Sequence, residues 1–162
     1  MGYAVNVHAR ATLITPPVEF LGMYDESGRK WMMDTVRRAD DGDSEAMKAL
    51  NVLSGRRIEE IGTRALDRLI AEGSSWAPLL LGRLFEERCQ TDDDVCTAIR
   101  LYEESADKAN PYAMVAMARI FERGDHVVRS FHNAYIQYKR AASMGCPPAV
   151  EWMERNGEKG RC

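Results

Sequence analysis

The 162-residue sequence has no long apolar run, no excess of positive charge and no clear targeting segment. A membrane-spanning helix needs about 20 consecutive apolar residues, and no stretch of this chain reaches that length. The net charge of −3 provides no basic field that would attract a nucleic-acid backbone. Polar residues interrupt the apolar positions before Pro16, unlike those of a signal peptide. We therefore expect a cytoplasmic protein that binds neither nucleic acid nor membranes.

Residue types that carry catalytic chemistry are few and scattered. His8, His126 and His132 are the only histidines, and none has the acidic or cysteine partners at helical spacing that a metal site needs. The acidic run at 92–94 lacks the alternating spacing of a calcium loop and predicts a turn in which Asp94 caps the following helix. No glycine-rich phosphate loop or nucleophile elbow is present. The sequence predicts no catalytic residues, no metal and no cofactor.

The four cysteines do not determine whether the protein belongs to an oxidising or a reducing compartment. Cys89 and Cys96 flank the Gln90–Val95 loop, a spacing compatible with a disulfide that staples the loop. Free thiols are the alternative and the usual state in a reducing cytosol. A zinc site is not predicted, because a second ligand pair at suitable spacing is absent.

The dominant feature that the sequence does contain is a repeat of 36 residues. Ala77, Ala113 and Ala149 lie 36 positions apart, and a fixed period in this range is typical of stacked supersecondary units. The repeated stretch covers residues 77–149. The same offset joins Phe85 with Phe121, Ala98 with Ala134, Tyr102 with Tyr138, Ala106 with Ala142, and Gly73 with Ala109 and Gly145.

Apolar spacing predicts two helices in each unit. Leu81 and Phe85 follow Ala77 by four and eight positions, which places all three on one face of a first helix. Gly82 lies beside this face and predicts a close crossing with a neighbouring helix, because glycine otherwise destabilises a helix. The expected helix boundaries are Asp94 and Ser130 before the second helices, Asn110 with Pro111 before the next first helix, and Gly145 after its helix.

These signals predict an all-α fold with one helical domain at 29–156. The preceding residues, 1–28, show no helical period and form either a poorly ordered terminus or an extended N-terminal arm that packs on the helices. Phe20, Leu21, Met23 and Tyr24 would anchor such an arm. The helical domain is predicted to contain a lone helix at 30–41, a degenerate repeat at 44–73 that has lost five residues from a loop around Gly55, repeats at 75–109 and 111–145, and a capping helix at 147–156, followed by a tail at 157–162.

Two segments resemble a known repeat family. The Leu-Gly pair at 81–82 with Phe85, and the run at 139–145 followed by Ala149, are similar to the Sel1-like repeat, a relative of the tetratricopeptide repeat with a longer loop between its helices. The resemblance covers roughly residues 30–155. It implies a right-handed α-solenoid of stacked antiparallel helix pairs, whose first helices line a concave face. Such an array is stabilised by contacts between neighbouring units.

By resemblance to tetratricopeptide units, side chains of the first helices outside the packing positions face the concave groove. Aromatic and arginine side chains are enriched where binding energy concentrates, so their recurrence at 36 residues predicts a partner-binding ladder. The alternative interpretation is structural: packing between units, and i,i+3 ion pairs within one helix. The predicted partner-binding residues are Trp76 and Tyr112, Arg83 and Arg119, Glu86 and Glu122, with Lys48 extending the basic row.

These features together predict a non-catalytic module that binds a protein or peptide partner in the groove. The family resemblance implies a bacterial adaptor or regulator. A narrower alternative is an immunity protein or chaperone that neutralises one cognate toxin or effector, and tight one-to-one binding would distinguish it. An enzyme or small-ligand binder would need a closed pocket with convergent polar groups. Self-association through an open end is a further alternative, so we expect a monomer or weak dimer.

Overall fold

The computed structural model describes residues 26–157, and within this range the protein is helical and contains no strand. The all-α fold is therefore confirmed, although α1 begins four residues earlier than the expected helix at 30–41. The proposed arm and its anchors lie outside the described residues, apart from residues 26–28, which are helical and not extended. The helices of this range are α1 (Glu26–Asp40), α2 (Ser44–Asn51), α3 (Gly55–Ile61), α4 (Arg64–Ala71), α5 (Trp76–Arg88), α6 (Asp92–Asp107), α7 (Pro111–Arg123), α8 (Phe131–Ser143) and α9 (Pro147–Asn156).

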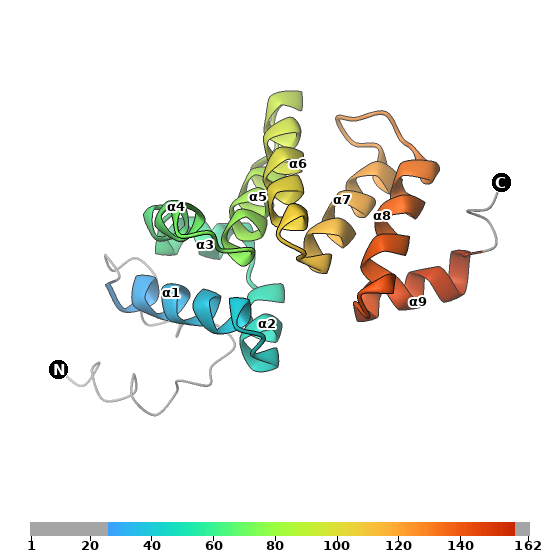
Figure 1. Ribbon diagram of the computed structural model, residues 1–162. Helices are drawn as coiled ribbons and strands as arrows, with labels where there is room; N and C mark the ends of the chain where they lie inside the picture. Colours follow the sequence, from blue (N-terminus) through green and yellow to red (C-terminus); the bar gives the residue numbers. More distant parts are fainter. Residues whose placement is uncertain (1–25, 158–162) are drawn as a thin grey trace.

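Helices that are neighbours in the chain pack together through the second half of the molecule. α5 packs on α6, α6 on α7, α7 on α8, and α8 on α9, so the chain advances across the view from α1 at the left to α9 at the right (Figure 1). In the first half, α1 packs against α2, and α3 and α4 pack against α5. Buried side chains from all these helices form one apolar cluster. The core is thus assembled largely from contacts between helices close in sequence.

The 36-residue period reappears as a repeated set of contacts. Tyr102 of α6 is buried and donates its hydroxyl hydrogen bond to Glu86 of α5. Tyr138 of α8 is also buried and donates in the same way to Glu122 of α7, at 3.0 Å. The two helix pairs therefore use equivalent residues for equivalent bonds. Six small residues at repeated positions are fully buried: Ala77, Ala98, Ala113, Ala118, Ala134 and Ala149.

The close helix crossing predicted at Gly82 is confirmed. A Cβ atom at this position would lie 2.7 Å from Cε1 of Tyr102 and 3.2 Å from the carbonyl oxygen of Ala98. Both neighbours belong to α6, and the Tyr102 ring is buried and tied to Glu86. The absence of a side chain at Gly82 is what allows α5 and α6 to approach this closely.

The helix boundaries agree with the sequence at three places and differ at one. Ser130 and Asn110 cap α8 and α7 with their side chains, and Gly145 follows α8 with a φ of 77°. Asp94 was the wrong choice for the cap of α6, because the N-cap is Thr91. The Asp94 carboxylate completes a capping box by accepting from the backbone N–H of Thr91 at 3.1 Å. All three aspartates at 92–94 thus lie in the first turn, where the helix dipole favours negative charge.

The degenerate unit at 44–73 does not have the predicted form of one helix pair with a shortened loop. Gly55 begins α3 instead of lying in a loop, and the Ser54 side chain caps that helix. α3 then ends at Gly62, which has a φ of 102°. A side chain is strongly disfavoured in this conformation, so the glycine separates α3 from α4. The apolar pattern alone did not reveal this break.

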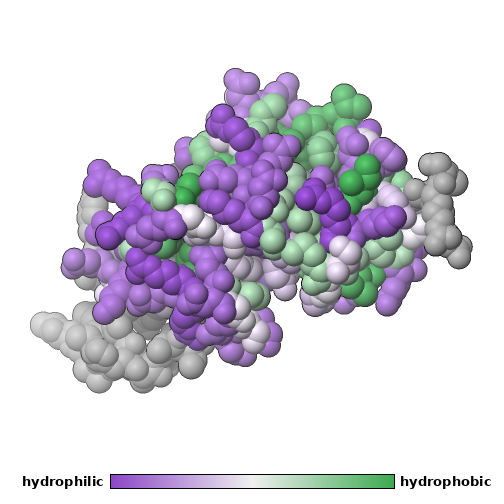
Figure 2. All heavy atoms as spheres, in the orientation of Figure 1, coloured by the Kyte–Doolittle hydropathy of each residue, from purple (hydrophilic) through white to green (hydrophobic). Residues whose placement is uncertain are grey.

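Exposed apolar side chains concentrate near α8. Hydrophilic residues dominate the face over α1–α4, whereas hydrophobic residues gather over the half that holds α6–α9 (Figure 2). The exposed large apolar residues in the described part of the chain are Val52, Val128, Phe131, Ile136 and Met144.

Candidate functional site

A pocket of about 360 Å³ is lined by residues of α2, α5, α6, α7 and α9. We call it the α5–α7 pocket, because these two helices supply all of its charged side chains. Three arginines and two glutamates share its wall, together with the aromatic side chains of Tyr102 and Tyr112. The charged and amide residues of the lining are Asn51, Arg83, Glu86, Glu87, Arg119 and Arg123.

The pocket brings together four of the seven residues that the sequence singled out. Arg83, Glu86, Tyr112 and Arg119 line it, although two units of the chain supply them. Lys48 does not line it and lies on the exposed face of α2, where its Nζ is 3.6 Å from Oε1 of Glu45. Trp76 and Glu122 also lie outside the lining, so the expected ladders enter the pocket only in part.

The Arg83 side chain has a structural role. Its Nη1 donates to the carbonyl oxygens of Leu50 at 2.6 Å and Leu53 at 2.8 Å, at the end of α2. A cation at this position gives the carbonyls at the end of α2 an additional donor and complements the helix dipole. Burial lowers the pKa of the Arg83 guanidinium, and the nearby Tyr102 and Glu87 oppose that shift. The i,i+3 ion pair with Glu86 is not formed.

Glu86 joins three helices at the edge of the pocket. Its carboxylate on α5 accepts hydrogen bonds from the Tyr102 hydroxyl of α6 and from Nη2 of Arg123 on α7. Burial raises the pKa of Tyr102, and the negative charge of Glu86 adds to the shift. The Arg123–Glu86 ion pair links one repeat to the next, so this part of the pocket wall is held in place before any partner binds.

Glu122 makes the corresponding link one unit later. It accepts from the Tyr138 hydroxyl of α8 at 3.0 Å and from Nε1 of Trp152 on α9 at 3.1 Å. The Tyr138 and Trp152 rings also stack, with centroids 4.2 Å apart. Burial and the Glu122 carboxylate raise the pKa of Tyr138 to about 12, and the nearby Arg119 guanidinium opposes the rise. Glu122 therefore braces α7, α8 and α9 and does not line the pocket.

Trp76 and Tyr112 pack against each other between the two units. Their ring centroids are 5.3 Å apart, and only 3% of Trp76 is exposed. Tyr112 is half-buried and presents its remaining surface to the α5–α7 pocket. Of this aromatic pair, only Tyr112 can contact a partner without a rearrangement of the core.

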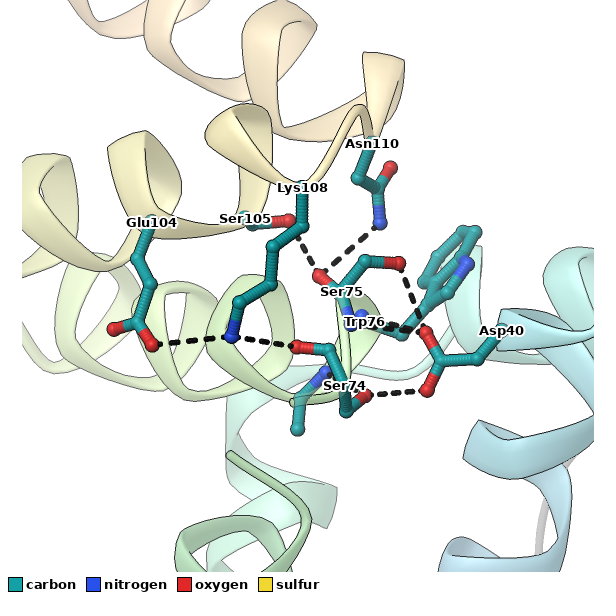
Figure 3. A network of polar contacts seen from close by, with 9 residues as sticks. Asp40, Ser74, Ser75, Trp76, Glu104, Ser105, Lys108 and Asn110 are labelled. Atoms are coloured by element: carbon teal, nitrogen blue, oxygen red, sulfur yellow. Dashed lines mark hydrogen bonds and ion pairs between the residues drawn. The ribbon is translucent and has the colours of Figure 1, made fainter. Parts of the chain in front are cut away.

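A polar network that the sequence reasoning missed fixes the beginning of α5 (Figure 3). The Asp40 carboxylate, from the end of α1, accepts from the backbone N–H groups of Ser75 at 3.0 Å and Trp76 at 3.2 Å. On the other side, the Ser75 carbonyl accepts from Oγ of Ser105 at 2.6 Å and Nδ2 of Asn110 at 3.4 Å. The only local signal was an acidic residue in the last turn of α1, where the helix dipole disfavours it. The network positions the helix that carries Arg83 and Glu86.

A second pocket of about 280 Å³ contains Cys89 and His126. Nδ1 of His126 lies 2.8 Å from Oδ1 of Asp92, which makes the group superficially similar to a cysteine–histidine–acid arrangement. Burial raises the pKa of the Cys89 thiol, and the negative charges of Asp94 and Asp92 raise it further. Because the thiolate is the nucleophile, these surroundings oppose nucleophilic chemistry. Cys89 and Cys96 are both free thiols, so the disulfide that the sequence left open is not formed.

The described part of the chain also contains no metal-ion site and no membrane-spanning helix. Among residues 26–157, no cluster of three histidine, cysteine or acidic side chains could hold a metal ion. In the same range, no helix combines the length and apolarity needed to cross a membrane. Neither the protein-family models nor the curated proteins include a match to this chain. The structure thus establishes an all-helical protein. A pocket lined by both positive and negative side chains lies between its two regular helix pairs.

Proposed function

We propose that this protein is a non-catalytic interaction module that binds a protein or peptide segment at the α5–α7 pocket. The observation that carries the proposal is the convergence of Arg83, Arg119, Arg123 and Tyr112 on one pocket from two units of the chain. Arginine and tyrosine are the residue types in which interface energy most often concentrates. Several wall residues are already fixed by intramolecular bonds, which lowers the entropy cost of binding.

The finer architecture belongs to the same proposal: a right-handed α-solenoid of Sel1-like helix pairs, acting as a bacterial adaptor or regulator in the cytoplasm. The equivalent Tyr102–Glu86 and Tyr138–Glu122 bonds support repeated units. So does the packing of successive helices on their chain neighbours. In a solenoid of this kind, the units expose one extended surface to partners, and the α5–α7 pocket would be part of it.

The test is affinity capture from lysate of the source cells with three forms of the full chain: wild type, Arg119→Glu and Arg100→Glu. Arg119 and Arg100 are both exposed helix arginines, but only Arg119 lines the pocket. Arg83 is unsuitable, because its substitution would remove the bonds to the end of α2. Circular dichroism checks that each variant is folded, and quantitative mass spectrometry measures the bound proteins.

We expect one stoichiometric partner with the wild type and with Arg100→Glu, and a loss of about tenfold or more with Arg119→Glu. Equal capture by all three forms would move the binding site away from the pocket. Failure of the wild type to retain any protein or peptide would refute the module itself. The identity of a captured partner would then separate an adaptor from an immunity protein.

A further inference from the structure

The two carboxylates of the α5–α7 pocket already have partners within the protein. Glu86 accepts from Tyr102 and forms an ion pair with Arg123. Oε2 of Glu87 accepts from the backbone N–H of Gly55 at 2.6 Å, at the beginning of α3. Both negative charges of the lining are thus held at the pocket edge by groups of the fold.

Two of the three arginines have no carboxylate partner. Arg83 donates through Nη1 to two carbonyl oxygens, which carry no net charge to neutralise the guanidinium. Arg119 forms no ion pair within residues 26–157, and the Tyr138 hydroxyl beside its guanidinium is uncharged. Among the lining side chains, three arginines and two glutamates leave one unit of positive charge. The nearby Glu122 carboxylate lies outside the lining and is held by hydrogen bonds from Tyr138 and Trp152. The pocket therefore has a place for one negative charge.

Arg119 and Arg83 occupy the same repeat position but are used differently. Arg83 donates to the carbonyl oxygens of Leu50 and Leu53, at the end of α2 in the degenerate unit. Arg119 is exposed, and its guanidinium lies close enough to the Tyr138 hydroxyl to oppose the rise in the pKa of that group. One arginine of the ladder holds the fold together, while the other presents its guanidinium at the pocket.

We propose that the α5–α7 pocket binds an acidic side chain, aspartate or glutamate, of the partner segment, with Arg119 as the residue that pairs with its carboxylate. The inference rests on the proposed function and specifies the chemistry of the partner. Arg83 contributes positive potential from behind, and the exposed part of Tyr112 packs on the methylene groups of the acidic residue. The single excess charge favours one carboxylate over a dianionic phosphate, which Glu86 and Glu87 would repel more strongly.

The test is a selection of random peptides displayed on phage against the full-length protein, with no partner assumed. Enriched peptides are then synthesised, and their binding to wild type, Arg119→Gln and the matched Arg100→Gln is measured by fluorescence anisotropy. Each peptide is also made with every acidic residue changed in turn to its amide, and with phosphoserine at the same position. These variants show whether binding depends on one particular carboxylate of the peptide and on the Arg119 guanidinium. A general effect of net charge would appear equally with Arg100→Gln.

We expect one acidic residue per peptide whose amide form binds about tenfold or more weakly. Arg119→Gln should bind the acidic and amide forms equally, whereas Arg100→Gln should keep the difference. Pocket-dependent peptides without an essential acidic residue would overturn the inference and leave the proposed function standing. Tighter binding of phosphoserine would overturn the choice of a carboxylate. A selection that yields no peptide sensitive to Arg119 would count against both proposals.

Discussion

Ala109 offers a direct test of whether the helix ends repeat as the sequence does. This residue follows α6 with a φ of 63°, in the left-handed region that disfavours side chains. The positions 36 residues before and after it are Gly73 and Gly145, with φ values of 91° and 77°. All three ends close with the same pair of backbone hydrogen bonds, of which Asn110 N–H to the Ser105 carbonyl, at 3.2 Å, is one. We therefore expect Ala109→Gly to stabilise the protein.

The expected gain is about 0.5–1 kcal/mol in the free energy of unfolding. A left-handed conformation costs an L-residue roughly 1–2 kcal/mol, and the greater freedom of glycine in the unfolded chain offsets about 0.4–1 kcal/mol of that. Ala109 is exposed, so removal of its methyl group loses no buried contact. Gly145→Ala is the matched reverse change. A Cβ atom there would meet no other atom within 4 Å, so the backbone term alone should destabilise it by a similar amount.

Urea unfolding of the full chain, followed by circular dichroism, measures both variants. Ala109→Gly should raise the midpoint without changing the slope and raise Tm by roughly 2–4 °C per kcal/mol. Gly145→Ala should lower both. If Ala109→Gly is neutral or destabilising, and Gly145→Ala is also without effect, the three helix ends do not share a left-handed cap.

Three further substitutions test the packing, the polar network and the buried phenol. Gly82→Ala should cost about 1–3 kcal/mol, because its Cβ atom would collide with the Tyr102 ring; an unchanged urea midpoint would contradict the close crossing. Asp40→Ala should cost about 1–2 kcal/mol by removing the acceptor of two N–H groups at the beginning of α5, whereas Asp41→Ala, which removes none of these bonds, should have little effect on Tm. The raised pKa of Tyr138 implies that stability is intact below pH 10 and falls as the pH rises toward about 12. Tyr138→Phe should flatten this fall in urea midpoints measured across that range, and an unaltered slope would remove Tyr138 as its cause.

The regular helix pairs were predictable because several independent signals agree on them. Ser130, Asn110 and Gly145 mark boundaries that fit the apolar period, and Gly82 marks the crossing between two of the helices. Where the period is weak, the prediction failed. Gly62 divides the degenerate unit into α3 and α4, and only its backbone conformation makes the division evident.

The pocket was predictable only in part, because local spacing does not specify distant partners. Arg83 and Arg119 look alike in sequence, yet one is bound to carbonyls about thirty residues earlier in the chain and the other is not. Glu122 looks like a groove residue, but Trp152 of α9 supplies a donor that turns it inward. Likewise, Trp76 is covered by contacts that span two units. Identifying these roles requires the three-dimensional arrangement of α2, α5, α7 and α9.

The interhelical bonds of Glu86 and Glu122, which we call the glutamate braces, also affect how the protein unfolds. Glu86 ties α5 and α6 to Arg123 of the next unit, and Glu122 ties α7 and α8 to Trp152 of α9. Separation of two neighbouring units therefore breaks one of these braces, which couples their opening reactions. Amide hydrogen exchange should accordingly report α5–α9 as one cooperative block whose units open together, and not as a series of units that fray one after another from the C-terminal end.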